Sequence, residues 1–272
     1  MGSQFTEADT ERYYDAEDAI YRSFWDQEGS LHWGYFDEAT GTDFLKACAN
    51  LNDIMANRAA IDQDSRVLDM GCGNGNTAIW LNKSRGCHIT GVDLSGVRIA
   101  NAQEAIKILP AQAHGRVGFE KASATSLPYD EDTFTHVWSQ ATIYHGHQKD
   151  EALQEAYRVL NPGGVFVFDD LIKPKADISQ EASTHVYERL LFDTPFSFDS
   201  YRQTLTEVGF QVEKAQDLSS HLKTSYQCLG RMARQRSESA GDKFDSLVQA
   251  YGQMVKAIDN HELGWAMYIC RK

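Results

Sequence analysis

The sequence predicts an α/β fold in which a mostly parallel sheet of seven strands carries helices on both faces. The first observation behind this prediction is that short apolar runs alternate with helix-periodic stretches from Ser65 onward. The second is a glycine-rich turn directly after the first of these runs, and the third is the alternating last segment, GWAMYICRK. Alternation of strand and helix gives right-handed crossovers, so ligands are expected beyond the carboxyl ends of the strands.

The expected elements follow from this periodicity in chain order. Apolar residues at helical spacing predict a helix over residues 44–60, ahead of the first strand. The core is expected to comprise strand 66–70, helix 76–84, strand 88–93, helix 95–108, strands 117–122 and 134–139, helix 149–160 and strand 164–169. The later elements are helices over 176–192 and 197–208, a strand over 211–217, two helical stretches to about residue 260, and the last strand.

The alternation changes after Asp170, and this change divides the chain. We expect a helical cap over residues 1–64, an α/β core over 65–172, remaining core elements with an inserted helical lid over 173–262, and a final strand over 263–272. The final strand is expected to be antiparallel and to pair with the strand around Val212. The lid helices then lie between these two strands in the sequence.

A strand, a carboxylate and a glycine-rich turn follow one another in the segment RVLDMGCGNGNTA, residues 66–78. The apolar run contains Asp69 close to its end, and the turn contains Gly71, Gly73 and Gly75, which let the backbone bend sharply and approach a ligand. A second carboxylate, Asp93, ends the next strand roughly twenty residues further on, where nucleotide-binding folds place an acid against ribose hydroxyls. The pattern predicts a cofactor loop, and the alternative is an unliganded turn.

Charge separates the two kinds of ligand that such a loop can hold. A dinucleotide puts its pyrophosphate at the helix N-terminus and requires G-x-G-x-x-G, but Asn76 stands at the sixth position here. Asp69 would repel a pyrophosphate, whereas it would attract a ligand that carries an ammonium and a sulfonium group. The sequence therefore predicts S-adenosylmethionine as the cofactor.

Composition restricts the partners of the chain. Its 272 residues include 26 Lys and Arg against 39 Asp and Glu, a net charge of -13, which disfavours a nucleic acid partner. Arg231, Arg234 and Arg236 have helical spacing and are expected to form a solvated face. We expect a small-molecule partner, and a protein that is a monomer or a homodimer.

The N-terminus and the cysteines predict the location. The first residues are too polar and acidic for a signal or transit peptide, and the sequence has no apolar run of membrane-spanning length. The five cysteines lack C-x-x-C spacing, which is typical of reduced thiols and not of a disulfide framework or a zinc site. A cytoplasmic protein without a membrane partner is expected.

Four blocks in the same order carry a resemblance to a known family. They are VLDMGCGNGNTA, GVDLS, SLPYDEDTF and RVLNPGGVFVFDD. Together they resemble the class I S-adenosylmethionine-dependent methyltransferases, which implies a Rossmann-like sheet, and the likeness runs from roughly Tyr13 to the C-terminus. Within this class, LHWGYF, the helical insert and the last strand are similar to small-molecule enzymes: sarcosine and dimethylglycine N-methyltransferases, phosphoethanolamine methyltransferases and natural-product sugar O-methyltransferases.

The resemblance implies roles for the matched positions in holding the cofactor. The methionine part is expected to be lined by Gly71, Gly73, Gly75 and Gln140, with Asp69 near its ammonium group. Asp93 is expected to accept from both ribose hydroxyls, and Leu94 to pack on the adenine. The chain departs from the family in the loop after the third strand, because Ser123 stands where an Asp usually accepts from the adenine amino group. An uncharged hydroxyl is a weaker acceptor, so Ser123 and Ala124 are expected to contribute less than Asp93.

The reacting end is expected to contain His145. Methyl transfer is an in-line displacement at a sulfonium, so the protein must chiefly align the acceptor lone pair and exclude water. By resemblance to the phosphoethanolamine enzymes, His145 is the candidate catalytic histidine and Tyr13 or Tyr14 its N-terminal tyrosine partner, with Tyr14 the catalytic candidate. A neutral histidine can take a proton from an ammonium or a hydroxyl, or orient it. The alternative is a histidine that only caps a loop.

A second acid resembles a catalytic residue of the sugar O-methyltransferases. Asp170 matches their acid, but their histidine falls at Tyr144 here, so only half of that pair is matched. Tyr13, Trp33 and Tyr144 are candidates for the acceptor pocket, where aromatic faces attract methylated amines, although the cap aromatics could equally be core. His145 and His147 lack a matched third ligand, so no metal is expected.

These residues predict transfer of a methyl group from S-adenosylmethionine to a small-molecule acceptor. An amine nitrogen of an amino-acid-like or other small metabolite is favoured, and a hydroxyl of a sugar or natural product is the alternative. The segment SQATIYH lacks the D/N/S-P-P-Y/F turn of enzymes that methylate planar nitrogens in DNA or protein. A non-catalytic S-adenosylmethionine-binding partner protein is a further alternative.

Overall fold

The computed structural model describes residues 5–13, 15, 32–107, 109, 115–146, 148–191, 194–240 and 243–272. The first half comprises a helical stretch over residues 7–13, then α2 (Phe44–Arg58), β1 (Arg66–Met70), α3 (Asn76–Arg85), β2 (His88–Asp93), α4 (Gly96–Ile106), β3 (Val117–Lys121), β4 (Phe134–Gln140) and the 3-10 turn η1 (Ile143–His145). The second half comprises α5 (Lys149–Val159), β5 (Leu160–Ile172), α6 (Gln180–Ala182), the π-helix η2 (Ser183–Glu188), α7 (Phe198–Val208), β6 (Gln211–Asp217), α8 (Ser219–Ala240), α9 (Lys243–Asp259) and β7 (Gly264–Arg271). Tyr14 and His147, both named above as candidates, lie outside the described residues.

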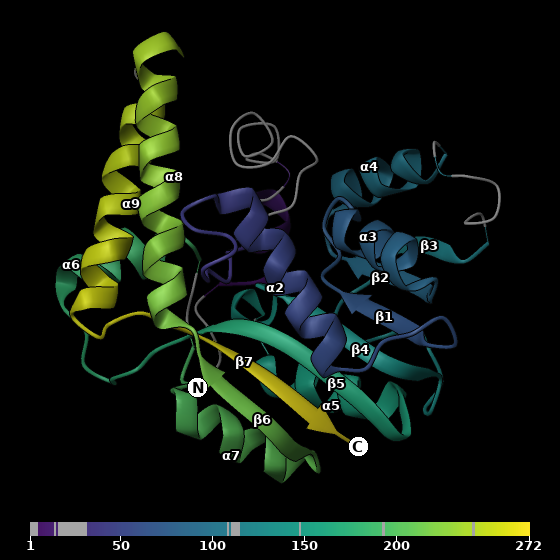
Figure 1. Cartoon of the computed structure of the whole chain (residues 1–272). Helices are drawn as coiled ribbons and strands as arrows, with labels where there is room; N and C mark the ends of the chain where they lie inside the picture. The colour runs from purple at the N-terminus through teal and green to yellow at the C-terminus, as the bar shows by residue number, and fades with distance from the viewer. Residues whose placement is uncertain are drawn as a thin grey trace.

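The strands form one seven-stranded sheet in the order β3-β2-β1-β4-β5-β7-β6 (Figure 1). Neighbours from β3 to β5 pair in parallel, and β7 runs antiparallel to both β5 and β6. The predicted fold class, a mostly parallel sheet with an antiparallel last strand, is therefore confirmed. The predicted contact of the last strand is also present, because Val212 pairs with Cys270.

β5 is longer at both ends than the predicted strand over 164–169. Leu160 pairs with Phe134 of β4 at one end, and Ile172 pairs with Gly264 of β7 at the other. The strand thus extends beyond its apolar run, because β4 and β7 offer partners on either side of it. Successive side chains of β5 face opposite sides of the sheet, and this alternation will decide which acids reach the ligand site.

Two hydrophobic layers cover the sheet. The layer under the cap and lid contains Val165 and Val167 of β5 together with side chains of α2, α8 and α9. The opposite layer contains Phe166 and Phe168 with side chains of α5 and α7. Helices therefore cover both faces, as the strand–helix alternation predicts (Figure 1).

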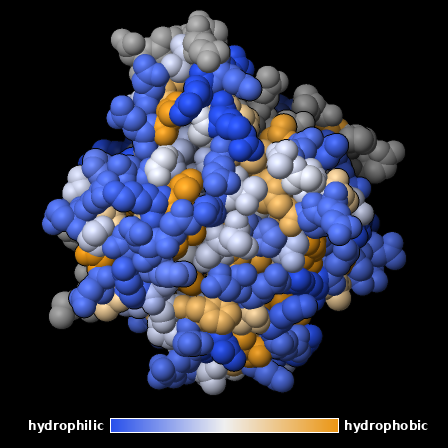
Figure 2. All heavy atoms as spheres, turned by 60° about the vertical axis from the view of Figure 1, so that its left-hand side comes forward, coloured by the Kyte–Doolittle hydropathy of each residue, from blue (hydrophilic) through white to orange (hydrophobic). Residues whose placement is uncertain are grey.

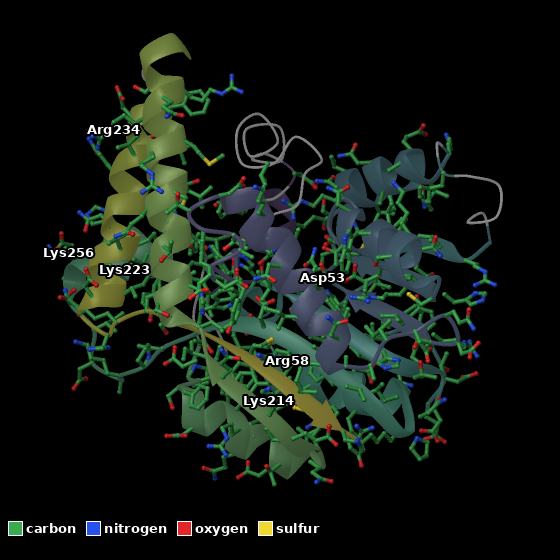
Figure 3. The ribbon with its side chains drawn as sticks, viewed as in Figure 1. Asp53, Arg58, Lys214, Lys223, Arg234 and Lys256 are labelled. Atoms are coloured by element: carbon green, nitrogen blue, oxygen red, sulfur yellow. The ribbon has the colours of Figure 1, made fainter. Side chains whose placement is uncertain are left out.

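The cap helix α2 is fixed at both of its ends. Asp43 caps its start by accepting from the Lys46 backbone N–H, and Leu51 and Met55 of its buried face are fully enclosed. At its last residue, Arg58 donates to the side chain of Gln216 in β6 over 2.7 Å (Figure 3). This contact ties the cap to the far edge of the sheet.

The predicted helix over 176–192 is wrong at both ends. Ser179 is the N-cap, accepting from the Ala182 N–H, and its own N–H donates to Glu262 over 2.7 Å, so the helix begins only at Gln180. The regular α-helix then gives way to the π-helix η2, and Leu191 beyond it has a positive φ of 50°. Capping thus overrides the apolar pattern of the preceding residues.

α8 and α9 form an antiparallel pair that extends beyond the end of the sheet (Figure 1, green and yellow). Lys223 and Asp259 form an ion pair of 2.6 Å at its base, and Lys256 pairs with Glu181 of α6 (Figure 3). None of the described helices combines the length and hydropathy that crossing a membrane requires. The face in Figure 2 is mostly hydrophilic, with apolar side chains in small groups.

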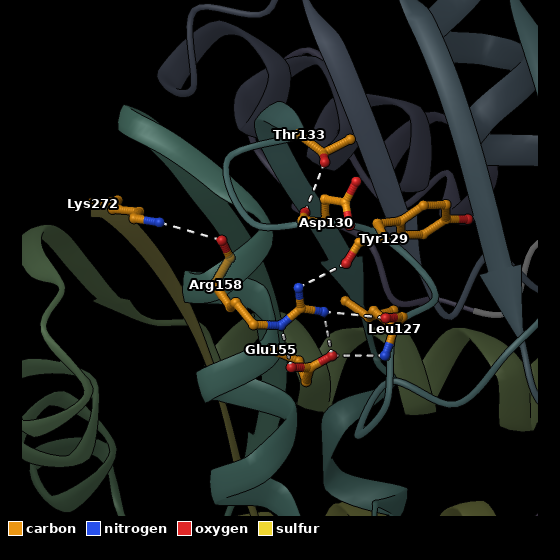
Figure 4. Close-up of polar contacts among 7 residues, drawn as sticks. All are labelled: Leu127, Tyr129, Asp130, Thr133, Glu155, Arg158 and Lys272. Carbon is orange, nitrogen blue, oxygen red and sulfur yellow. Dashed lines mark hydrogen bonds and ion pairs between the residues drawn. The ribbon is translucent and has the colours of Figure 1, made fainter.

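Arg158 of α5 holds the loop between β3 and β4 (Figure 4). Its guanidinium contacts Glu155 over 2.6 Å and donates to the carbonyl oxygens of Tyr129 and Leu127, while Glu155 accepts from the Leu127 N–H. Bonding to Arg158 holds the pKa of Glu155 below its usual value. The same loop begins with Ser123 and Ala124, so this network helps to fix one wall of the ligand site.

Gly75 begins α3 with a left-handed φ of 80°, and a β-carbon there would lie 2.5 Å from the ring of Phe119 and 2.9 Å from Ala102. We expect Gly75→Ala to lower the free energy of unfolding by about 2–4 kcal/mol, because it combines backbone strain with overpacking. Urea denaturation measures this loss. The matched control is Gly252→Ala, which meets nothing within 4 Å in the middle of α9 and should stabilise by about 0.5–1 kcal/mol. Equal stability of the two variants would contradict the packing role of Gly75.

Candidate active site

A pocket lies at the carboxyl ends of β1, β2 and β4, where the sheet topology places ligands. Its wall includes the glycine-rich turn after β1, the end of β2, the loop after β3, and the turn from β4 into η1. Residues of the N-terminal helical stretch, Glu7, Thr10 and Glu11, and His32 of the cap complete it. The described site is therefore built by local motifs on one side and by distant chain segments on the other.

Asp93 is held rigidly at the end of β2. Its two carboxylate oxygens accept from the backbone N–H groups of Gly73 over 2.9 Å and Ser95 over 2.8 Å. Burial raises the pKa of Asp93, and the nearby charge of Arg98 opposes that rise. The carboxylate is fixed by backbone donors, so it can accept from a ligand with little reorganisation.

Asp69 lies on β1, 2% exposed, and faces the same pocket. Its Oδ2 makes no hydrogen bond within the described chain. Burial, with a contribution from the charge of Asp93, raises the pKa of Asp69 to about 7. Because an unpaired buried carboxylate is costly, this position favours a cationic ligand group that would pair with it.

The three glycines of the turn differ in what they do. All have positive φ, but only Gly71 and Gly73 line the pocket. A β-carbon on Gly71 would lie 2.2 Å from the side chain of Thr142, whereas one on Gly73 would meet only Arg98 at 3.8 Å. Gly75 packs behind the turn and does not line the pocket. A glycine is needed at this position because a side chain would collide with the ring of Phe119.

Gln140 connects three elements around the pocket. Its Nε2 donates to Asn52 of α2 over 3.0 Å, and its Oε1 accepts from Thr77 of α3 and from Trp138 of β4. The side chain of Gln140 is thereby fixed at the end of β4, at the pocket wall. The cap helix and the glycine-rich turn are linked through this single amide.

His145 is a neutral, buried histidine at the pocket wall. It ends the turn η1, is 7% exposed, and its ring centroid lies 3.8 Å from that of Tyr144. Burial, reinforced by the positive charges of Lys149 and Arg98, lowers its pKa well below the ordinary value of 6.5, and a hydrogen bond with the Leu190 backbone opposes this. A neutral imidazole can accept a proton or orient a donor.

Asp170 faces away from the pocket, into the layer that contains Phe168. One of its oxygens accepts from the Tyr144 backbone N–H over 3.0 Å and the other from the Tyr201 hydroxyl over 3.0 Å. Burial raises its pKa to about 8. The preceding residue, Asp169, points to the cap side and accepts from Trp265 Nε1 over 2.8 Å. Asp170 therefore contacts the backbone of η1, not the pocket surface.

The cap aromatics lie in the core beside the pocket. Trp33 is 3% exposed, and its ring centroid lies 5.6 Å from Trp265 and 6.3 Å from Tyr144. Tyr13 is partly buried against the same cluster. Neither Tyr13, Trp33 nor Tyr144 belongs to the described pocket wall, which Leu94 and Ala124 do join. Ser123 lies just behind that wall, where its hydroxyl donates to the carboxylate of Glu7.

The sequence does not reveal several wall residues, of which His32, Arg98 and Thr142 are examples. They belong to the predicted cap, to a predicted helix and to the connection between the strand 134–139 and the helix 149–160, and tertiary packing brings them to the pocket. Within the described residues, no group of three or more His, Cys, Asp or Glu side chains has the arrangement of a metal site.

A family profile described as "Methyltransferase domain" matches residues 68–168, from β1 to β5. The chain is a class I S-adenosylmethionine-dependent methyltransferase. Its cofactor is S-adenosylmethionine. The matched region contains both pocket acids and the glycine-rich turn.

Similar proteins extend the likeness beyond the matched region. A 27-O-demethylrifamycin SV methyltransferase of Amycolatopsis mediterranei is 29% identical over 78% of this chain and 77% of that protein. A sarcosine/dimethylglycine N-methyltransferase of Halorhodospira halochloris is 27% identical over 96% of this chain and 95% of that protein. The structure of Haemonchus contortus phosphoethanolamine N-methyltransferase 2 has the same fold, with a TM-score of 0.82 at 19% identity, covering 98% of this chain and 60% of that one.

The pocket of this methyltransferase fits its cofactor chemically. Asp69 offers an unpaired buried oxygen where an ammonium group would be neutralised, and Asp93 offers a fixed carboxylate where two hydroxyls would donate. Gly73 has no side chain to occupy the pocket wall, so a ligand can approach its backbone closely.

The raised pKa of Asp69 makes the ligand-free protein sensitive to pH. Its folded pKa of about 7 exceeds the ordinary value of 3.8, so the folded state keeps a proton that the unfolded chain loses as the pH rises from 3.8 to about 7. We expect Asp69→Asn to be more stable than the wild type by about 1–4 kcal/mol above pH 7, with the difference vanishing near pH 4. The same variant should bind S-adenosylhomocysteine at least about tenfold more weakly. Thermal unfolding with and without this ligand measures both effects, and a destabilised ligand-free variant would contradict the assignment.

Proposed function

We propose that this methyltransferase transfers the methyl group of S-adenosylmethionine to a small-molecule acceptor, with an amine nitrogen of an amino-acid-like or other small metabolite favoured. The observation that carries the proposal is a neutral, buried His145 in a pocket that the cap encloses. His32 and Thr10, 4% and 6% exposed, belong to that enclosure. An enclosed site suits a small acceptor and excludes water, while the net charge of -13 disfavours nucleic acid.

A relative named for methylation of an amine is similar to this chain over nearly its whole length. The sarcosine/dimethylglycine N-methyltransferase of Halorhodospira halochloris aligns with nearly the entire chain, so the likeness includes the cap and lid as well as the cofactor core. Acceptor choice depends on these two regions, because the cofactor core is shared by enzymes with different acceptors.

The cofactor supplies a methyl group that is already activated by the positive sulfur, so the chain's own residues chiefly orient and enclose. In our proposal, Asp69 neutralises the ammonium group, Asp93 accepts from the ribose hydroxyls, and Gly71, Gly73 and Gln140 line the methionine part. The imidazole of His145 accepts the proton that the acceptor gives up, or a hydrogen bond from it. Because the pKa of His145 is lowered, its imidazole is uncharged at neutral pH and can take up a proton.

Five further predicted residues receive roles in the proposal. Asp170 acts as a positioning residue, since it holds the N–H of Tyr144 next to His145 and is itself held by Tyr201. Tyr14, which lies outside the described residues, is proposed as the partner of His145 on the strength of the family resemblance alone. Tyr13, Trp33 and Tyr144 are proposed to support the acceptor side of the site from the core.

O-methylation is the second candidate function. The 27-O-demethylrifamycin SV methyltransferase that resembles this chain is named for transfer to an oxygen. A neutral His145 also serves this reaction, because a hydroxyl can donate its proton to the same imidazole nitrogen. The acceptor atom is therefore decided by what binds beside His145.

The proposal also includes the cellular location, the oligomeric state and the division of the chain into regions. All five cysteines are free thiols in the described structure, which supports a cytoplasmic location. We further propose a monomer or homodimer, and a division into cap, α/β core, lid-containing region and last strand at residues 64, 172 and 262.

Replacing His145 tests the catalytic part of the proposal. His145→Ala is expected to lower kcat by about 100-fold or more, because a positioned acid–base group contributes that much. Since the wild-type pKa is well below 6.5, the wild type should show no loss of kcat from His145 protonation between about pH 6.5 and 8. Initial rates at saturating cofactor measure both. His88→Ala, at the exposed start of β2, is the control with unchanged kcat, and full turnover by His145→Ala would remove the catalytic role.

Labelled cofactor identifies the acceptor. The protein is incubated with S-adenosylmethionine bearing a deuterated methyl group and with separate pools of small amines and of hydroxylated natural products. Mass spectrometry is expected to find the label on nitrogen in the amine pool. Label only on oxygen would replace the favoured function by the second candidate, and label only in a polymer fraction would overturn both.

A further inference from the structure

The N-terminal segment, residues 5–13 and 15, covers one end of the pocket with carboxylates. Glu11 forms an ion pair of 2.6 Å with Lys121 at the end of β3, and Asp15 accepts from Ser95 after β2. Glu7 accepts from the hydroxyls of Ser123 and Thr125 in the loop after β3. Three acids of one short segment thus meet the β2 and β3 side of the sheet.

The distribution of charged and apolar residues along the pocket indicates which end of the cofactor would bind beneath the N-terminal segment. The strand order places β3 next to β2 and β2 next to β1, so the wall runs from the β3 loop past Asp93 to Asp69. Asp69 attracts the cationic methionine end. Beyond Asp93, the wall includes the apolar side chains of Leu94 and Ala124, which suit the flat face of a purine. The adenine end therefore lies under the N-terminal segment.

The edge of adenine carries an amino group that needs an acceptor. In the β3 loop, the hydroxyl of Ser123 is already engaged, because it donates to Glu7 and accepts from the Thr125 N–H over 3.1 Å. Glu7 belongs to the pocket wall, and both loop hydroxyls bind the same oxygen, Oε1. Within the described chain, Oε2 of Glu7 receives no hydrogen bond.

We infer that Glu7 is the acceptor for the adenine amino group, held in place by Ser123 and Thr125. The inference rests on S-adenosylmethionine occupying this pocket. It gives the N-terminal segment a specificity-determining role, since the carboxylate that recognises the base comes from a segment more than 50 residues before the cofactor loop in the sequence. The loop after β3 then supplies the hydroxyls that orient the acid, not the acid itself.

Two product analogues that differ in the 6-substituent of the base, and in the proton that the inosyl base carries on the neighbouring N1, test the inference. S-Adenosylhomocysteine carries the amino group, and S-inosylhomocysteine carries a carbonyl oxygen that a carboxylate repels. We expect calorimetry on the wild type to show a preference for the adenosyl ligand of about tenfold or more, because the bond involves a charged acceptor. In Glu7→Gln the preference should fall to within about twofold, because an amide can accept from the amino group or donate to the carbonyl.

Glu11→Gln is the matched control, since it removes one charge and one ion pair from the same segment. It should weaken both ligands equally and preserve the wild-type preference. The readout is a ratio of two affinities on one variant, so a loss of folded protein does not change it. An unchanged preference in Glu7→Gln would show that Glu7 only holds the N-terminal segment against the loop after β3, and it would overturn the inference. Wild type that binds the amino ligand without any preference also overturns it, and wild type that binds neither ligand overturns the cofactor pocket as well.

Discussion

The buried pair of carboxylates at the ends of β1 and β2 is the constraint on which the site depends. Asp69 and Asp93 share one low-dielectric region, and the charge of Asp93 adds to burial in raising the pKa of Asp69. Asp93 is compensated by two backbone N–H groups, whereas Asp69 has an oxygen without a partner in the described chain. The asymmetry assigns the two acids different tasks. In the proposed function, Asp93 accepts from hydroxyl groups at a fixed position, and Asp69 pairs with a positively charged group.

The rest of the architecture supplies what this pair requires. The glycine-rich turn brings backbone donors to Asp93, and its first two glycines leave space that side chains would fill. Gln140 bonds to Asn52 of α2 and to Thr77 in the first turn of α3, so one amide joins the cap to the helix that follows the glycine-rich turn. The aromatic cluster around Trp33 then fixes the cap against the last strand. The side chains around the pocket are thereby held in place without a ligand, which lowers the entropy that binding would cost.

The sequence was sufficient for the fold and for the local part of the site. Asp69, Gly73 and Asp93 could be found because strand, turn and acid lie next to one another in the chain, and their spacing reflects the ligand directly. Glu7 and His32 could not, because they reach the pocket by packing across the whole molecule. The adjacent acids Asp169 and Asp170 show a second limit. Both follow an apolar strand, and only the register of β5 decides which one faces the cap and which one faces α7.

The helix after β5 was misplaced for a different reason. Its apolar periodicity extends to Ala176, but the side chain of Glu262, 83 residues later, binds the N–H of Ser179 and fixes the first turn. A capping interaction between segments so distant leaves no local signal. Short-range patterns thus predict where elements exist better than where they begin.

The position of β7 has a consequence for how the chain is synthesised. This strand follows every other strand of the sheet in the sequence, yet it lies between β5 and β6 and pairs with both. Until β7 has been synthesised, β5 therefore has an open edge and β6 has no partner strand in the sheet. The parallel half and the α8–α9 pair can form before that point, whereas the sheet becomes continuous only once β7 pairs. An exposed edge during that interval is prone to pairing with other chains, so this eight-residue strand also ends a period of aggregation risk.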